Sequence, residues 1–309
     1  MTTSLTVIPV PAAGAEDVVV GGPGPHEGAV FTGTEDGSIF RISHDGDRID
    51  RVARTGGRPL GLELEADGRL LVCDARRGLL HVDVGTGAVE LVVDQVSGRP
   101  MVFCNNAAIA TSGDVWFSDS STEFGIDRWK DDLVQDTRTG RLLHRTGTGE
   151  VEVVLDGLAF ANGVALAADE SYVAVAETGA RTVVRRWLTG ERAGTRDHLC
   201  QDLPGYPDNI ARGSDGLIWV TIASPTDPVV ERLQRSPRWL SRQVTRIPEP
   251  LQPKPKRTVR VQAYDDTGAL VHDLDLPAAG YHMVTGVREH EGRVWLGSLH
   301  EPAVAVVEL

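Results

Sequence analysis

The sequence predicts an all-β fold, a six-bladed β-propeller formed by a single domain over residues 1–309. A unit of two short apolar strands joined by a tight turn occurs six times. Uninterrupted copies follow one another at roughly 40 to 46 residues, the period of a four-stranded propeller blade. Helical periodicity is almost absent outside one insertion. A β-sandwich is the alternative, but it should not show so regular a period.

The repeated units can be followed in order by their turns. They lie at residues 14–42, 58–83, 103–119, 161–177, 205–220 and 283–297. In the fifth unit the dipeptide Asp215-Gly216 separates two β-branched and aromatic runs, as in a hairpin. The N-terminal segment Leu5–Val10 is expected to pair with Ala303–Val307 in the last blade. Such pairing of the two chain ends would close the ring and remove exposed strand edges.

One insertion interrupts the repeats between blades five and six, at about residues 226–256. Several prolines surround the segment Val229–Ile247, which is rich in arginine. Apolar residues follow a helical spacing within it, at Leu233, Trp239, Leu240 and Val244. We expect a short, partly helical flap over one face of the propeller. A surface excursion with no role at a site is the alternative.

Composition restricts the classes of partner. A net charge of −13 argues against nucleic acid and anionic membrane surfaces, both of which favour basic patches. No apolar segment approaches the roughly 20 residues that span a bilayer, and no secretory signal is evident. The three cysteines, Cys73, Cys104 and Cys200, lack C-x-x-C spacing and predict no disulfide framework. These features predict a soluble cytoplasmic protein that acts on a small molecule, with no indication of its oligomeric state.

Polar residues recur where the innermost strands begin. Counting back about eight residues from each turn glycine, or from Glu170 in its place in blade four, gives Leu60, Asn105, Asn162, Asp208 and Val284 in blades two to six. In blade one the count gives Val20, and allowing for a turn lengthened by about four residues at 22–26 moves the equivalent position to Glu16. Inner strands of a propeller surround its central channel, so these positions form a ring, and four of them offer oxygen ligands. Two carboxylates with amide oxygens suit Ca²⁺ better than Zn²⁺ or copper. The alternative is that each Asn or Asp caps a local turn.

Four segments carry a family resemblance: residues 160–166 (FANGVAL), 205–210 (GYPDNI), 251–255 (LQPKP) and 281–285 (YHMVT). With the ring residues, they resemble the gluconolactonase, senescence-marker-protein and strictosidine-synthase-like superfamily of six-bladed propellers. The last two segments are similar to the strictosidine-synthase-like branch in particular. The resemblance covers nearly the whole chain. It implies one catalytic Ca²⁺ held by Glu16, Asn105, Asn162 and Asp208.

The chain departs from that branch at one position. Strictosidine synthase itself performs a metal-free condensation with a glutamate near the start of its last blade, and the matching position here is Thr285 or its neighbour. No carboxylate lies between Tyr281 and Val287. The sequence therefore resembles a hydrolase that kept the metal. Alternatives are another enzyme on the same scaffold, such as a phosphotriesterase-type hydrolase or a condensing enzyme, and a non-catalytic binding propeller.

The expected reaction is hydrolysis of a lactone or an ester. Ca²⁺ would polarise the carbonyl group and hold the developing oxyanion. Asp208 could orient water, deprotonate it or attack directly. His282 is the other acid–base candidate, although a lone histidine is more often structural. The residues expected to contact substrate are Phe103, Tyr206, Asn209 and Trp239.

Overall fold

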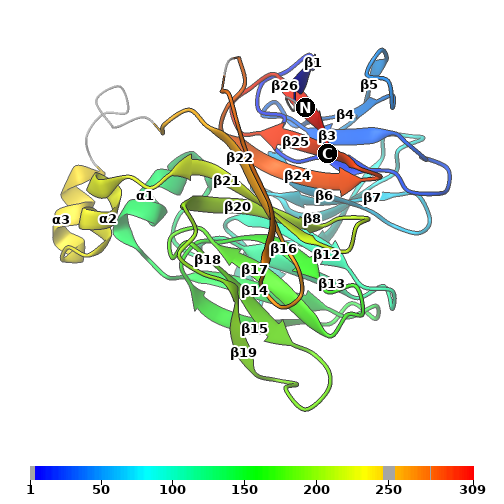
Figure 1. Cartoon of the computed structure of the whole chain (residues 1–309). Coiled ribbons are helices and arrows are strands. Elements are labelled where there is room, and N and C mark those ends of the chain that lie inside the picture. Colours follow the sequence, from blue (N-terminus) through cyan, green and yellow to red (C-terminus); the bar gives the residue numbers. More distant parts are fainter. Residues whose placement is uncertain (1–3, 246–254, 279) are drawn as a thin grey trace.

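The computed structural model describes residues 4–245, 255–278 and 280–309. These residues form six four-stranded antiparallel sheets, which confirms the six-bladed β-propeller. Figure 1 shows the sheets following one another around the molecule, so that strands of the first blade lie beside those of the sixth. A separate two-stranded hairpin precedes the third blade.

Each of the first five blades uses four consecutive strands. Blade one contains β2 (Val19–Val20), β3 (Val30–Gly33), β4 (Ser38–Ile42) and β5 (Ile49–Arg54). Blade two contains β6 (Pro59–Leu64), β7 (Leu70–Asp74), β8 (Gly78–Val82) and β9 (Val89–Val93). Blade three contains β12 (Cys104–Ile109), β13 (Val115–Asp119), β14 (Gly140–Arg145) and β15 (Val151–Leu158). Blade four contains β16 (Ala161–Leu166), β17 (Tyr172–Glu177), β18 (Thr182–Trp187) and β19 (Arg196–Cys200). Blade five contains β20 (Gly205–Arg212), β21 (Ile218–Pro225), β22 (Val259–Tyr264) and β23 (Leu270–Leu276). The hairpin comprises β10 (Gln95–Val96) and β11 (Arg99–Pro100).

The sixth blade joins the two ends of the chain. It consists of β24 (Val284–His290), β25 (Arg293–Ser298), β26 (Ala303–Glu308) and, as its outer strand, β1 (Leu5–Pro9). The β1–β26 register runs antiparallel from the Leu5–Val307 pair. The expected closure of the ring is therefore confirmed, and it covers an edge that would otherwise be open.

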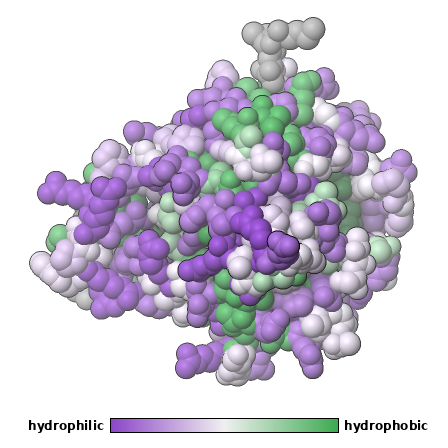
Figure 2. Space-filling model, turned by 60° about the horizontal axis from the view of Figure 1, so that its bottom comes forward, coloured by the Kyte–Doolittle hydropathy of each residue, from purple (hydrophilic) through white to green (hydrophobic). Residues whose placement is uncertain are grey.

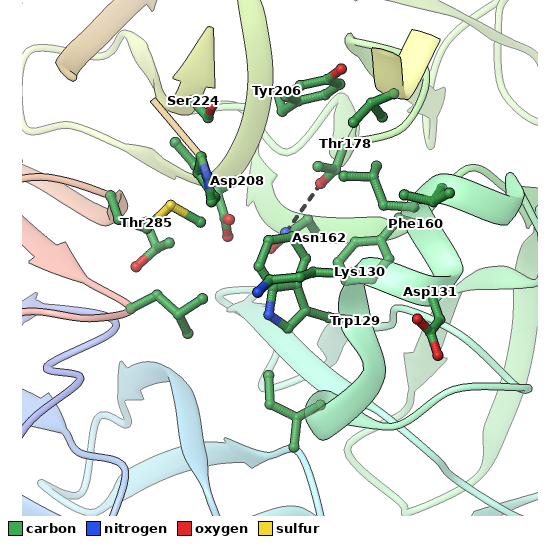
Figure 3. Close-up of a pocket in the computed structure, with 18 of the residues that line it drawn as sticks. Trp129, Lys130, Asp131, Phe160, Asn162, Thr178, Tyr206, Asp208, Ser224 and Thr285 are labelled. Carbon is green, nitrogen blue, oxygen red and sulfur yellow. Dashed lines mark hydrogen bonds between the residues drawn. The ribbon is translucent and has the colours of Figure 1, made fainter. Parts of the chain in front are cut away.

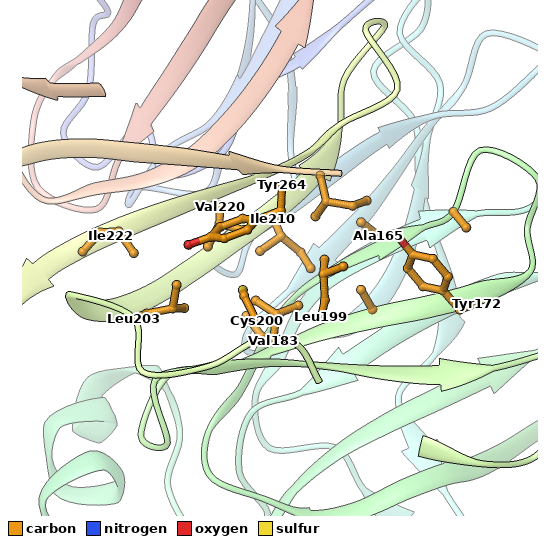
Figure 4. Close-up of a cluster of buried hydrophobic side chains, with 14 residues drawn as sticks. Ala165, Tyr172, Val183, Leu199, Cys200, Leu203, Ile210, Val220, Ile222 and Tyr264 are labelled. Atoms are coloured by element: carbon orange, nitrogen blue, oxygen red, sulfur yellow. The ribbon is translucent and has the colours of Figure 1, made fainter. Parts of the chain in front are cut away.

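The hydrophobic core lies between neighbouring blades. Apolar side chains of blade four, including Val183 and Leu199, pack with Ile210 and Val220 of blade five in one buried cluster (Figure 4). Strands buried on both faces need near-continuous apolar sequence, which is the pattern of β17. Burying such side chains stabilises the fold by roughly 1.5 to 3 kcal/mol each. All three cysteines are buried and free, in agreement with the absence of a disulfide framework.

Three short helices gather on one side of the propeller (Figure 1). The predicted insertion contributes α2 (Pro228–Gln234) and α3 (Arg238–Val244), in place of one continuous helical run. Asp227 caps α2 by accepting from the backbone N–H groups of its first turn. The third, α1 (Trp129–Gln135), follows the one-turn helix η1 (Ile126–Arg128) between β13 and β14 and corrects the expectation of a single helical region. We refer to α1, α2 and α3 together as the helical cap.

Residues 246–254, which include Ile247 and most of the 251–255 motif, lie outside the described residues. The face of the molecule in Figure 2 is largely hydrophilic, and its hydrophobic side chains form smaller groups. Within the described part of the chain, no helix has the length and apolarity needed to cross a membrane.

Candidate functional site

The inner strands carry a repeated irregularity that forms the site. In blades two to six the pairing register of the innermost strand shifts, and two consecutive residues are left out of the regular ladder. In blade five, for example, the shift lies between Pro207 and Ile210 and frees Asp208 and Asn209. A β-bulge of this kind bends the strand and redirects its side chains. The bulges therefore place one pair of residues from each of these five blades at the channel, and Glu16 and Asp17, just before the first strand of blade one, complete the set.

The first residue of each pair lines a common pocket. In blade order these residues, which we call the floor, are Glu16, Leu60, Asn105, Asn162, Asp208 and Thr285. Blade one has no bulge, because β2 begins only at Val19. In blade six the residue count predicted Val284, but Val284 pairs with Ser298 and the bulge places Thr285 in the pocket. A fixed count cannot detect such a shift.

The second residue of each pair alternates between polar residues and glycine. The polar members are Asp17, Asn106 and Asn209 in blades one, three and five, and the glycines are Gly61, Gly163 and Gly286 in blades two, four and six. A Cβ on Gly163 would lie 2.5 Å from the Asn209 Cα atom, and one on Gly286 would lie 2.6 Å from the Asp17 Cα atom. The glycines thus let neighbouring blades approach closely around the channel.

Hydroxyl groups fix the backbone of this layer. Thr285 Oγ1 donates to the carbonyl oxygen of Glu16 at 2.8 Å, and Ser118 Oγ donates to that of Asn162 at 2.7 Å. Thr221 Oγ1 lies within hydrogen-bonding distance of two carbonyl oxygens, those of Asn209 and Thr285. These contacts join neighbouring blades around the channel and fix the backbone positions of the floor.

The floor contains buried oxygen atoms without hydrogen-bond partners. They are Oε2 of Glu16, Oδ1 of Asn105 and Oδ1 of Asn162. The amide nitrogens of the two asparagines are already used, by Ser120 Oγ at 2.9 Å and Thr178 Oγ1 at 3.2 Å. This fixes each amide so that its oxygen stays unpaired. Leaving a buried acceptor unsatisfied costs about 1 to 3 kcal/mol, so three such oxygens together favour binding of a cation or a hydrogen-bond donor at the floor.

The carboxyl groups of the floor are held in an unfavourable electrostatic environment. Burial raises the pKa of Glu16 well above its usual range, and the charges of Asp208 and Asp17 raise it further. Burial also raises the pKa of Asp208 to about 7, although a hydrogen bond from Asn162 opposes the shift. Arg58 lies near Glu16 and lowers its pKa, but this one cation does not compensate for the burial. A bound cation would relieve the repulsion.

These residues fit a calcium ion. Two carboxylates and two amide groups offer hard oxygen ligands, and three of their oxygen atoms have no hydrogen-bond partner in the protein. Among the described residues, no group of three or more His, Cys, Asp and Glu side chains is suited to a metal. The floor has only two such residues, since asparagines supply the rest. Transition metals that prefer imidazole or thiolate find no matching ligands in it.

The pocket above the floor has a volume of about 150 Å³ and extends to the helical cap. Figure 3 shows Asp208 and Asn162 at the floor, with Trp129, Lys130 and Phe160 on the side of α1. The Phe160 and Phe103 rings meet edge to face with their centroids 5.4 Å apart. The cap helices contact one another and supply much of the wall. The site is therefore polar at its base and enclosed by apolar side chains.

Of the four residues expected to contact substrate, two line the pocket and two do not. Phe103 and Tyr206 line the pocket. Asn209 is buried and does not belong to the lining, because its Nδ2 atom donates to Glu16 Oε1 at 3.1 Å. Trp239 is 67 % exposed on α3 and does not line the pocket, which corrects the expected wall contact. The break at Pro237 begins a new helix, so the single apolar stripe assumed from the sequence does not exist.

His282 lies beside the pocket and not in its lining. Its Nδ1 atom pairs with Glu301, and its ring meets that of His300 edge to face at 5.8 Å between centroids. The adjacent residue, Met283, lines the pocket instead.

Sequence reasoning missed the contribution of α1. Ile126, Trp129 and Leu133 line the pocket at helical spacings of three and four residues. This spacing is a detectable signal, but the segment is short and lies between two strands of one blade. Thr178, which orients the Asn162 amide, gave no signal in sequence because its role depends on a contact between strands.

A six-bladed propeller with an oxygen-rich floor at its channel and a helical cap defines the class of this protein. The family described as strictosidine synthase matches residues 105–191. The human adipocyte plasma membrane-associated protein is 32 % identical over 307 residues, covering 91 % of this chain and 73 % of the relative. The protein strictosidine synthase-like 9 of Arabidopsis thaliana is 32 % identical over 329 residues, covering 99 % and 88 %. The chain belongs to the strictosidine synthase-like family.

Solved structures agree on the fold. A gluconolactonase from Xanthomonas campestris superimposes with a TM-score of 0.72 at 16 % identity, covering 99 % of this chain and 89 % of that one. The calcium-binding protein regucalcin from Agrobacterium tumefaciens gives 0.68 at 14 % identity, covering 99 % and 93 %. The resemblance to the gluconolactonase and strictosidine-synthase-like propellers is thus confirmed.

Proposed function

We propose that this protein is a calcium-dependent hydrolase of lactones or esters. The observation that carries the proposal is the set of three unpaired buried oxygen atoms, on Glu16, Asn105 and Asn162, next to Asp208 at the floor of the pocket. Two structural neighbours are described as a gluconolactonase and as a calcium-binding protein, which agrees with this chemistry. The expected partner is a small-molecule substrate.

Glu16, Asn105, Asn162 and Asp208 would hold the ion. When bound, Ca²⁺ supplies a positive charge that polarises the substrate carbonyl and stabilises the oxyanion. Asn209 keeps Glu16 oriented toward the floor, and Thr178 does the same for Asn162. The apolar wall excludes bulk water, which strengthens electrostatic interactions inside the pocket.

Asp208 is the candidate general base. It keeps some exposure to the pocket, and the remaining floor oxygens are buried. Its carboxylate would accept a proton from water as the water oxygen adds to the carbonyl carbon, and would return that proton to the leaving oxygen. Coordination lowers the basicity of a carboxylate, so this base acts with modest strength. His282 has less support as the acid–base group because it does not line the pocket; Glu301 pairs with its Nδ1 atom and leaves Nε2 without an assigned role.

A condensing reaction of the strictosidine synthase type has less support. The floor position of blade six is Thr285, whose hydroxyl donates to the Glu16 carbonyl. It offers no carboxylate to abstract a proton from an iminium intermediate. A location in the cytoplasm stays a prediction, and relatives carry the words plasma membrane-associated in their names.

The test is hydrolysis of a panel of lactones and aryl esters by purified protein, before and after chelation. We expect activity to be lost with EDTA, restored by Ca²⁺ and reduced at least about hundredfold by Asp208→Asn. An activity that survives both chelation and Asp208→Asn would rule out the proposed mechanism. A panel without turnover, combined with tight calcium binding, would favour a binding propeller.

A further inference from the structure

The wall of the pocket contrasts with its floor. Above the floor the lining is dominated by aliphatic and aromatic side chains from the blades and the cap. They are Phe103, Ile126, Trp129, Leu133, Val134, Phe160, Val229, Val230, Leu233, Val244, Met283 and Leu299. Both α1 and α2 contribute to this wall, and the two helices are in contact with each other. A ligand that reaches up from the floor therefore meets apolar side chains of both helices.

The polar groups in this wall are already engaged with the protein. The Asp131 carboxylate pairs with Arg128, and the Asp227 carboxylate accepts from the backbone N–H group of Val229 at 2.7 Å. Thr245 Oγ1 accepts from Gln135 Nε2 at 3.2 Å.

The other polar side chains of the wall also contact groups of the protein. Ser224 Oγ donates to the carbonyl oxygen of Pro225, and the Tyr206 hydroxyl accepts from the Asp227 backbone N–H group. Lys130 extends over the Trp129 ring, with its Nζ atom 5.7 Å from the ring centroid. A polyhydroxylated substrate would find few polar side chains in this wall, and those present already bond to the protein, so its hydroxyl groups would be poorly matched.

From this contrast we infer the substrate class of the proposed hydrolase: a lactone or ester that carries an extended apolar group, with its carbonyl at the floor and its alkyl or aryl part against the apolar side chains of α1 and α2. The inference rests on the proposed function. It distinguishes this chain from a sugar lactonase, even though a gluconolactonase shares its fold. Burial of each methylene group against this wall adds about 0.8 kcal/mol to binding, close to a fourfold gain in affinity.

The first experiment uses wild-type protein with Ca²⁺ and γ-lactones whose linear side chains run from methyl to octyl, with glucono-δ-lactone for comparison. We expect kcat/KM to rise about threefold to fourfold per methylene over the first several carbons, chiefly through KM. Glucono-δ-lactone should be a poor substrate. A flat response to chain length, or a preference for glucono-δ-lactone, would overturn the inference.

Matched tryptophan variants locate the apolar group. Trp129→Ala removes a wall residue of α1, whereas Trp239→Ala removes the exposed tryptophan of α3 outside the pocket. Trp129→Ala should reduce kcat/KM for the octyl lactone about tenfold and for the methyl lactone less than twofold. Trp239→Ala should leave both unchanged. Equal effects of the two variants would contradict the assigned position, and thermal unfolding of each variant would exclude a folding defect.

A binding measurement separates this inference from the proposed function. The same alkyl series as γ-lactams, which resist hydrolysis, can be titrated by calorimetry into the protein with Ca²⁺. Affinity that grows with chain length without turnover of any lactone would support the apolar site and contradict the hydrolase. Turnover of lactones with no chain-length dependence in either series would support the hydrolase and contradict the apolar site.

Discussion

Asn209 Nδ2 donates a hydrogen bond to Glu16 Oε1 at 3.1 Å, joining blade five to blade one across 193 residues of sequence. The second oxygen of Glu16 stays unpaired. The contact thus fixes one oxygen and leaves the other for a ligand. Asn209 was expected to contact substrate, but its position makes it a support for a floor carboxylate.

Replacing Asn209 should therefore weaken calcium binding without a direct contact to the ion. We expect Asn209→Ala to raise the calcium Kd about tenfold, because Glu16 loses the partner that orients it. Asn106→Ala is the matched control, since Asn106 occupies the equivalent position in blade three and holds the Val164 backbone N–H group. It should lower thermal stability but leave the calcium Kd within about twofold. Similar Kd values for the two variants would contradict the supporting role.

Glu16→Gln should have opposite effects on binding and on stability. Glutamine preserves the shape and still accepts from Asn209, but it removes a carboxyl group whose ionised form burial, Asp208 and Asp17 disfavour in the folded protein. We expect the metal-free variant to gain about 1 kcal/mol in unfolding free energy and to bind calcium at least about tenfold more weakly. Urea unfolding in EDTA and calcium titration measure the two effects. Glu90→Gln, at an exposed position, should change neither.

Stability of the metal-free protein should fall as pH rises. The folded pKa of Asp208 is about 7 and that of Glu16 is raised well above its usual value, so the fold favours their protonated forms. This contribution is complete below the ordinary carboxyl pKa of about 4 and is lost as pH passes the folded values. In EDTA, the unfolding free energy should be about 2 kcal/mol lower at pH 8 than at pH 5.5.

Saturating Ca²⁺ should remove or reverse this trend, because the ion binds the deprotonated ligands. The double variant Glu16→Gln/Asp208→Asn should show a weaker trend in EDTA, and the remaining trend comes from Asp17, whose pKa burial raises to about 7. A metal-free wild type that becomes more stable toward pH 8 would contradict the assigned electrostatics of the floor.

Gly163 should not tolerate even alanine. An added Cβ would lie 2.0 Å from the Ile210 backbone nitrogen, so the backbones of blades four and five would have to separate. We expect Gly163→Ala to destabilise the fold by about 2 to 3 kcal/mol and to weaken calcium binding, since Asn162 and Asp208 lie at this junction. Gly22→Ala is the control, because no atom lies within 4 Å of its added Cβ. It should stay within about 0.5 kcal/mol of wild type in urea unfolding.

The propeller could be predicted from sequence because its signal is local and repeated. Each blade carries its own turn and its own apolar strands, and β1 pairs with β26 as expected. The alignment of blades also led to Asn105, Asn162 and Asp208, which the structure brings together with Glu16. Regular spacing between turn and inner strand was sufficient for these positions.

What could not be predicted depends on geometry between distant segments. The bulge in blade six moved the floor position from Val284 to Thr285. A seven-residue helix such as α1 produces too short a periodic signal to stand out between strands. The orientation of Trp239 depends on where α3 begins after Pro237, and that of Asn209 depends on a partner 193 residues away.

Calcium titration by calorimetry into chelator-treated wild-type protein tests the central claim most directly. The four floor ligands predict one Ca²⁺ per chain, with binding abolished in the double variant Glu16→Gln/Asp208→Asn. Circular dichroism would verify that the variant keeps its β structure. A wild-type protein that takes up no calcium, or a double variant that binds it as tightly as wild type, would contradict the assignment of the floor as a calcium site.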